Sequence, residues 1–310
     1  MLFLGPKDMN SRLFEHSIVT SFPDLHPEAN LEIGFQLNLR RDVNDLNDNH
    51  LPGFGWLPVA YVGDYYKDVP IECSPDDMIL PLYQSEAMSI YFNSNFIKEH
   101  NNGYPFAIKI DFENFNAING RKVTNSLNDN PKNYITNLEQ SVFESYIEEN
   151  NFHQFIAPPL GLITSENSFF QKNINNYSIY IQIVPLKQEL FNVNFPVLNN
   201  VSENNTENEI CAIEEIIPLI VQDEQDSEEL VYGVNDENIK EDENDYVSSD
   251  WDNKLSKKLT IHVINTHFWQ NYLADKLIPR EPIKYKHYKY FDISWLEQYN
   301  EEYSFTIGNQ

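Results

Sequence analysis

Apolar and polar residues alternate strictly in several parts of the chain, and this period of two is the feature that most constrains the fold. In residues 31–39 every odd position holds Leu, Ile or Phe, whereas the even positions hold polar residues or glycine. Successive side chains of a β-strand point to opposite faces of a sheet, so this run predicts a strand with one buried face. The same pattern predicts strands in three other places, residues 104–112, 179–183 and 259–263. An extended run over residues 78–92 predicts one long or bent strand, and Pro81 marks its start because a proline there removes no ladder hydrogen bond.

Helical patterns are fewer than strand patterns. Thr136 and Glu139 have the spacing of a capping box, and apolar residues recur behind them at helical spacing as far as Asn150. We therefore expect a helix over residues 136–150 and shorter helices over residues 268–276 and 295–303. Strands and helices do not alternate regularly and no repeat is visible, which disfavours a doubly wound sheet or a solenoid. The sequence predicts an α+β fold that is β-rich, a largely antiparallel sheet or sandwich with a few short helices.

The negative charge of the chain is concentrated in one segment. The formal net charge is −27, and residues 203–252 hold 18 acidic residues against one basic residue, Lys240. A segment dominated by Asn, Glu and Asp buries too little apolar surface to offset the entropy lost on ordering it. We expect a single domain over residues 1–310 with a mobile acidic insertion at about residues 199–252, because the 58 residues that follow are too few to fold alone.

Charge and composition argue against several partners and locations. A strongly acidic surface repels phosphate groups, so nucleic acid is not expected as a partner. No stretch approaches the roughly 20 apolar residues of a membrane span, and the first residues do not resemble a signal peptide. These features predict a soluble, cytoplasmic protein that does not bind membranes, in which Cys73 and Cys211 are reduced thiols.

The sequence lacks the motifs of the common cofactor sites. It has only 10 glycines and contains no dinucleotide fingerprint, no phosphate-binding P-loop, no nucleophile elbow and no zinc motif of the usual spacing. His262 and His267 are five residues apart, which places them on opposite faces of a strand and argues against a shared metal ion. We therefore predict no cofactor and no metal site.

Glu86 is the residue that most suggests chemistry. On a strand it shares a face with Leu82 and Met88. A carboxylate in such apolar surroundings is costly to keep charged, which is one way of building a general acid or base. The alternatives are a structural glutamate held by buried backbone groups or by a cation, and a locally helical segment that exposes it. His153, which precedes Gln154, can likewise transfer a proton or bind a ligand, or it is a satisfied structural histidine.

Aromatic and basic residues are interleaved in residues 285–291 near the C-terminal end of the sequence. This composition suits stacking on single-stranded nucleic acid or on sugars. A packed terminal strand that covers the edge of the core is the simpler interpretation.

Five short motifs occur in order along the chain. They are Pro-x-Tyr-Gln-x-Glu-Ala-Met at 81–88, Tyr-Pro-Phe-Ala-x-Lys at 104–109, Asn-Ala-x-x-Gly at 116–120, Gln-Phe-x-Ala-x-Pro-Leu-Gly at 154–161 and His-x-x-Asn-x-x-x-Trp at 262–269. With these motifs the chain resembles a family of uncharacterised proteins found mainly in bacteria and fungi. It departs from the family at His153, where the family has Arg, and at Ser89, where the family has Trp. The resemblance implies one continuous domain and matching positions at Glu86, Lys109 and Gln154, and also at His262, but no activity.

Three functions are compatible with these observations. The poverty in motifs and the long acidic segment favour a non-catalytic binding or interaction protein, whose partner is a protein or a small molecule. The alternative is an enzyme with Glu86 as acid or base, supported by Lys109, His153 or Gln154. A structural protein that works by assembly is the third. Of the roles open to Glu86 we expect a structural tie, in which its carboxylate pairs with Lys109.

Overall fold

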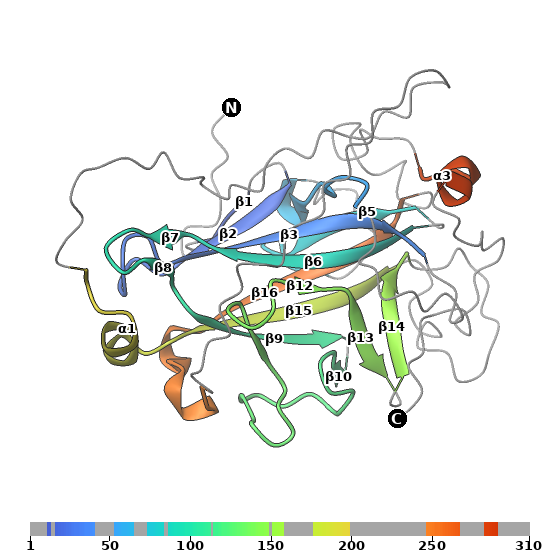
Figure 1. Cartoon of the computed structure of the whole chain (residues 1–310). Helices are drawn as coiled ribbons and strands as arrows, with labels where there is room; N and C mark the ends of the chain where they lie inside the picture. The colour runs from blue at the N-terminus through green and yellow to red at the C-terminus, as the bar shows by residue number, and fades with distance from the viewer. Residues whose placement is uncertain are drawn as a thin grey trace.

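Two seven-stranded sheets make up most of the structure (Figure 1). The protein is described by a computed structural model, which covers residues 11–13, 16–40, 53–64, 73–83, 86–112, 114–148, 151–157, 176–198, 246–266 and 282–290. The first sheet, sheet A, has the strand order β1 (Ser11–Leu13), β2 (Ser17–Ser21), β3 (Asn30–Leu39), β6 (Glu86–Ser94), β14 (Asn151–Ile156) and β13 (Ser145–Glu148), and β12 (Val142–Phe143) also pairs with β6. All of its neighbouring strands are antiparallel.

The second sheet, sheet B, is mixed. Its strand order is β10 (Phe115–Asn116), β9 (Phe106–Phe112), β15 (Asn176–Pro185), β16 (Lys257–Asn265), β5 (Met78–Leu82) and β4 (Ala60–Tyr61), and β11 (Ile135–Thr136) also pairs with β9. Only β16 and β5 run parallel among the strand pairs of the described residues. A separate hairpin joins β7 (Phe96–Ile97) to β8 (Asn102–Gly103).

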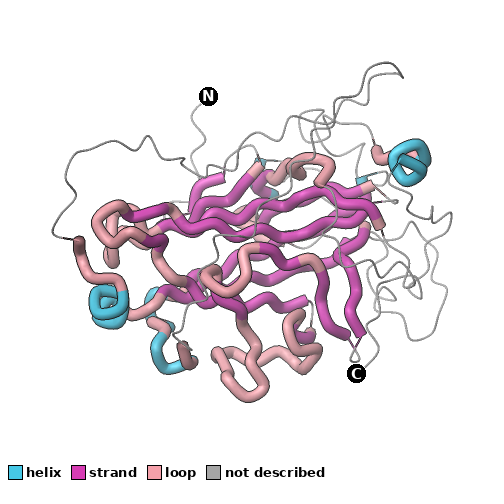
Figure 2. The backbone as a smooth tube through the Cα atoms, in the orientation of Figure 1, coloured by secondary structure: helices cyan, strands magenta, loops and turns pink. Residues whose placement is uncertain are grey.

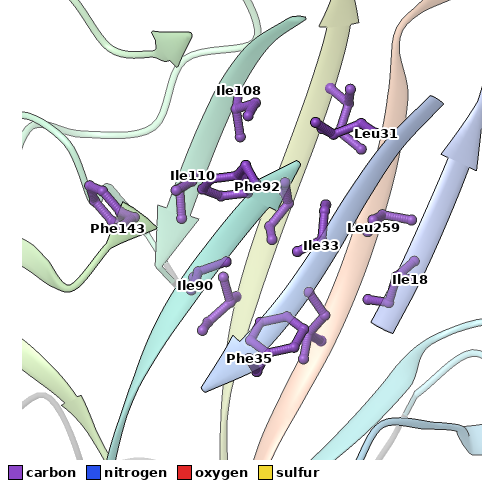
Figure 3. Close-up of a cluster of buried hydrophobic side chains, with 14 of the residues drawn as sticks. Ile18, Leu31, Ile33, Phe35, Ile90, Phe92, Ile108, Ile110, Phe143 and Leu259 are labelled. Carbon is purple, nitrogen blue, oxygen red and sulfur yellow. The ribbon is translucent and has the colours of Figure 1, made fainter. Parts of the chain in front are cut away.

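The inner faces of the two sheets pack against each other and form the core. Figure 3 shows Ile33 and Phe35 of β3 beside Ile90 of β6, with Ile110 of β9 and Leu259 of β16 from the other sheet in the same cluster. These side chains are buried, and burying one large apolar side chain contributes about 1.5–3 kcal/mol. Every second residue of the central strands faces this core, which explains why apolar and polar residues alternate in their sequences.

The predicted fold class is confirmed, as are four of the predicted strands. β3, β9, β15 and β16 lie where the period of two places them. Helices are few and short in the described residues: α1 (Gln188–Asn194), α3 (Tyr285–Tyr290) and the 3-10 helices η1 (Val62–Asp64), η4 (Ser248–Asp250) and η5 (Asn253–Leu255). Figure 2 shows them at the margins of the strand layers.

The prediction of one strand over residues 78–92 is wrong, because the run forms two strands in different sheets. β5 ends at Leu82 in sheet B and β6 begins at Glu86 in sheet A, and the Glu86 N–H donates to Tyr83 O at 3.0 Å. Pro81 lies within β5 and not at its start. It follows the two residues that pair with β4, so its missing N–H costs no bond to that strand.

The predicted helix over residues 136–150 is also wrong. The first turn of its pattern does form, since Thr136 Oγ1 accepts a hydrogen bond from the Glu139 N–H at 3.1 Å. Beyond this turn the chain runs as β12 and β13, because Val142 and Phe143 pair with β6 and residues 145–148 pair with β14. Pairing with strands that are distant in sequence thus overrides the local helical spacing.

At the C-terminal end, residues 285–290 form helix α3, so the interpretation of this stretch as a packed strand is wrong. Its Tyr288 is buried and accepts a hydrogen bond from the Arg40 N–H at 3.0 Å, which docks the helix at the end of β3. The predicted helices over 268–276 and 295–303 lie outside the described residues.

Of the acidic segment at residues 199–252, the structure describes only residues 246–252. Residues 199–245 lie outside the described residues. Residues 246–252 are packed along the end of β15, where Tyr246 and Trp251 are buried and the Asp252 N–H donates to Pro185 O at 2.8 Å. These seven residues therefore belong to the packed fold.

Candidate functional site

Glu86 lies between the two sheets and is fully buried, with an exposed fraction of 0%. It is the first residue of β6, opposite Leu39, and strand alternation places it on the inner face with Met88, as expected, whereas Leu82 belongs to the other sheet. Its two carboxylate oxygens accept hydrogen bonds from backbone N–H groups, Oε2 from Tyr83 at 2.8 Å and Oε1 from Ile283 at 3.1 Å. The carboxylate therefore connects the β5–β6 turn with a segment 197 residues away.

Lys109 does not pair with Glu86, so the expected ion pair between them is wrong. Lys109 stands between Ile108 and Ile110, which face the core, and must therefore point to the outer face of sheet B. There its Nζ donates to Asp111 Oδ2, and the pair is buried, with Lys109 only 1% exposed. Lys109 thus forms its ion pair with a residue two positions further along the same strand, and not with Glu86 across the core.

His153 and Gln154 are successive residues of β14 and point to opposite faces. The ring of His153 stacks on Tyr146 at a centroid distance of 5.4 Å. Gln154 is buried, and its Nε2 donates to Leu39 O at 3.3 Å. The four sequence candidates are therefore distributed over different places in the fold, and the structure does not bring them together in one site.

Gln154 belongs instead to a group of uncharged polar side chains on the outer face of sheet A, which we call the polar cluster. Its members come from β3, β6, β14 and the segment beside β3, and they are Gln36, Asn38, Trp56, Ser89, Tyr91 and Gln154. Gln36 is the centre, because it pairs with Ser89 on one side and with Trp56 on the other. Gln36, Asn38, Ser89 and Gln154 are buried, whereas the two aromatic rings are half-buried and form the edge of the cluster.

Hydrogen bonds hold part of the cluster and leave part of it unsatisfied. The Tyr91 hydroxyl donates to Gln36 Oε1 at 2.8 Å, and the Asn38 amide donates to Ser89 Oγ. Within the described part of the chain, neither Asn38 Oδ1 nor Trp56 Nε1 has a hydrogen-bond partner. Exchanging the two ends of the Asn38 amide would leave its nitrogen unpartnered instead, so one end is unsatisfied either way. Buried polar groups nearly always have a partner, so these two atoms require an explanation.

The orientation of Gln36 is fixed by its surroundings. A Cβ atom on Gly53 would lie 2.3 Å from Cδ and Nε2 of Gln36, so any other residue at position 53 would require the Gln36 amide to move. On the other side, the rings of Trp56 and Tyr91 meet edge to face at 5.2 Å. The Gln36 amide therefore lies against the backbone of Gly53 and accepts the hydrogen bond of Tyr91.

The electrostatics of the cluster suit binding better than proton transfer. None of its six side chains is a carboxylate, an ammonium or an imidazole. Burial raises the pKa of Tyr91 to about 12, with a smaller contribution from the charge of Glu144, so the phenol stays protonated at neutral pH. The cluster thus offers neutral donors, neutral acceptors and aromatic surface.

Sequence reasoning found Gln154 but missed the other members. Gln36 and Asn38 belong to the polar half of the alternation in residues 31–39, which is normally a solvated face. Their amides differ from the charged residues typical of such a face, and this is the signal that could have found them. Ser89 and Trp56 carry no local signal, because they join the cluster only through strand pairing.

A second polar arrangement crosses the outer face of sheet B. His262 Nδ1 lies 3.0 Å from Ser178 Oγ, and His262 Nε2 lies 3.1 Å from Asp77 Oδ2. The order of groups is that of a nucleophilic triad, but the ring nitrogens are exchanged relative to that template, in which Nε2 faces the serine. Asp77 Oδ2 also accepts the Ser74 N–H at 2.8 Å, which ties it to its own turn. This arrangement satisfies a buried histidine on both of its nitrogens.

One group of three potential metal ligands occurs in the described residues. His26, Glu99 and His100 have ligand atoms that all lie within 4.8 Å of one another. Glu99 and His100 are adjacent but lie 73 and 74 residues after His26, so no local motif predicts the group. His267, the other half of the histidine pair considered above, lies outside the described residues.

No family model, curated protein or solved structure matches the chain. The family resemblance of its motifs therefore stays a prediction. None of the helices in the described residues is long and apolar enough to span a bilayer.

Proposed function

We propose that the protein is a non-catalytic binding protein, and that its polar cluster holds a small, uncharged ligand rich in hydroxyl groups, such as a sugar or a polyol. The observation that carries the proposal is the pair of unpartnered polar atoms, Asn38 Oδ1 and Trp56 Nε1, within a buried and otherwise hydrogen-bonded group. Leaving such atoms without partners costs about 1–3 kcal/mol each. Both atoms are buried, so a ligand removes this cost only when the side chains that cover them move aside to admit it.

The chemistry of the cluster selects the ligand class. A hydroxyl group donates one hydrogen bond and accepts others, so hydroxyls can satisfy both the Asn38 acceptor and the Trp56 donor. The half-buried rings of Trp56 and Tyr91 offer apolar surface to the C–H face of a sugar. A charged ligand is disfavoured, because the cluster has no opposite charge to offset the cost of burying it.

The two other functions lack this support. For the enzyme, the carboxylate of Glu86 already accepts two backbone hydrogen bonds, and His153 and Lys109 lie elsewhere. For assembly, the exposed large apolar residues of the described chain include Phe96, Val193 and Tyr285, on three different elements. A cytoplasmic location and the exclusion of nucleic acid and membranes as partners remain predictions from composition.

Binding is tested by calorimetric titration of the full chain with a panel of neutral sugars and polyols, alongside sugar phosphates and sugar acids. We expect at least one neutral compound to bind and its charged analogue to bind more weakly. Trp56→Phe keeps a ring and removes the donor, so the Kd should rise about tenfold, the equivalent of one hydrogen bond. Trp251→Phe is the matched control, because Trp251 is buried at a different place, beside Tyr246.

A double variant separates binding from stability. Asn38→Leu with Ser89→Ala replaces both partners by apolar groups, so no orphaned polar atom remains at this point. We expect the free energy of unfolding to rise by about 1–3 kcal/mol and the melting temperature by roughly 2–6 °C, while binding is lost. Such a gain at the expense of binding is typical of functional sites. The proposal fails if no neutral ligand binds, or if the Trp56 and Asn38 variants bind it as tightly as the parent.

A further inference from the structure

We infer that His26, Glu99 and His100 form a binding site for one zinc ion that links two turns at one end of the sandwich. His26 lies in the turn between β2 and β3, and the other two residues lie in the turn of the β7–β8 hairpin. Figure 1 shows this hairpin and α1 at the same end of the molecule. The ligand atoms of all three residues already lie within 4.8 Å of one another.

His100 is the best prepared of the three ligands. Its Nδ1 is hydrogen-bonded to the carbonyl oxygen of Phe195, and because a carbonyl only accepts, Nδ1 must carry the proton. The neutral ring therefore presents an unprotonated Nε2, the form that coordinates metals, and a backbone carbonyl is a usual outer partner of a metal-bound histidine. The ring is buried and packs on Phe191 at a centroid distance of 4.6 Å, which fixes its direction.

The other two ligands are able to move. The ring of His26 is half-buried and meets the ring of His100 edge to face at 5.8 Å. Its Nδ1 accepts a hydrogen bond from the Glu28 N–H at 3.1 Å, an exposed contact that the ring gives up when it turns its Nε2 to the metal. Glu99 has an exposed side chain on a fixed backbone, since its carbonyl accepts the Leu198 N–H at 2.9 Å. Both side chains can therefore close on His100 without moving the strands.

The donor set selects the metal. Two imidazoles and one carboxylate suit zinc, which binds such ligands at about 2.0–2.2 Å in tetrahedral geometry. Ligand atoms around a tetrahedral ion are then roughly 3.3–3.5 Å apart, so atoms that now lie up to 4.8 Å from one another must approach by at most about 1.5 Å. Calcium and magnesium prefer oxygen ligands alone. Three protein ligands leave the fourth position to water or to a further group, as in zinc sites that remain open.

The test is a zinc titration of the chelator-stripped full chain in competition with a chromogenic chelator. The chain has 48 acidic residues, so millimolar magnesium is present throughout to suppress weak binding by carboxylates. We expect one zinc ion per chain, with affinity at least tenfold lower in His26→Gln and in Glu99→Gln. Both positions are partly or fully accessible, so these variants should fold. His16→Gln and Glu189→Gln change exposed residues outside the site and should bind like the parent.

Two further measurements identify the ligands. Cobalt in place of zinc should give the visible absorption of a tetrahedral site in the parent and not in His26→Gln. Affinity should fall steeply between pH 7.5 and 5.5, because protons compete with the metal for the imidazoles. The inference is overturned if the His26 and Glu99 variants bind zinc with the same stoichiometry and affinity as the parent, which would assign the binding to the acidic residues in general.

Discussion

Replacing Glu86 by glutamine removes one charge from the interior and keeps the shape of the side chain. In the parent both carboxylate oxygens accept backbone hydrogen bonds, from Tyr83 at 2.8 Å and from Ile283 at 3.1 Å. A glutamine has one oxygen and one NH₂ group, so one of the two backbone N–H groups must face another donor. We therefore expect Glu86→Gln to destabilise the fold at the junction of β5, β6 and the segment before α3.

The magnitude follows from the two contacts. A hydrogen bond to a charged group contributes about 1.5–3 kcal/mol, and a buried N–H without a partner costs about 1–3 kcal/mol. The neutral amide avoids the cost of burying a charge, which offsets part of this loss. We expect a net loss of about 2–4 kcal/mol in the free energy of unfolding, equivalent to a melting temperature lower by roughly 4–10 °C.

Urea and thermal unfolding of the parent and the variant measure this loss. Glu189→Gln is the matched control, because Glu189 is exposed in the first turn of α1. Amide hydrogen exchange locates the effect, and the Ile283 amide should lose protection in Glu86→Gln and keep it in the control. A Gln variant that unfolds no earlier than the parent would refute the structural role and return Glu86 to the candidates for proton transfer.

Two further predictions concern the end of the acidic segment. Burial acts to raise the pKa of Asp129, but hydrogen bonds from the Ser248 hydroxyl, the Tyr134 hydroxyl and the Ser248 N–H, at 2.7, 2.8 and 2.8 Å, outweigh it and the pKa is lowered. The stability that this contact contributes is therefore present above about pH 4 and lost as the pH falls through the lowered value, so the melting temperatures of parent and Asp129→Asn should differ at pH 6 and approach each other as the pH is lowered below 4. Replacing residues 205–243 by a short Gly/Ser linker should leave the melting temperature within a few degrees of that of the parent, because the replacement removes negative charges that repel one another. Extending the deletion to residues 205–250 should lower it clearly, because it removes the buried Tyr246, and equal melting temperatures for the two deletions would contradict this reading.

The sequence alone determined four of the strands and the buried position of Glu86. A period of two is a local property, so residues 31–39 and 179–183 predict strands with one apolar face wherever those strands lie in the sheet. The same alternation places Glu86 on the inner face with Met88, and the structure agrees. These inferences succeed because they depend only on which way successive side chains point.

The pairing of strands was decided by the tertiary structure. The apolar spacing of residues 136–150 fits a helix as well as short strands, and only the free edges of β6 and β14 settle the choice. The break between β5 and β6 likewise depends on the turn that sends one run into two sheets. Local spacing cannot separate these outcomes, because their energies differ through contacts with residues far along the chain.

Both candidate sites arise in the same way. Gln36 and Ser89 meet through the register of β3 and β6, and His26 meets Glu99 and His100 because two turns end on the same side of the sandwich. Apart from the amide of Gln36, none of these residues stands out in its local sequence. Their side chains form a site only because the fold buries them beside particular neighbours. Strand register and the placement of turns decide which residues become neighbours, and the alternation of apolar and polar residues in the sequence does not determine either.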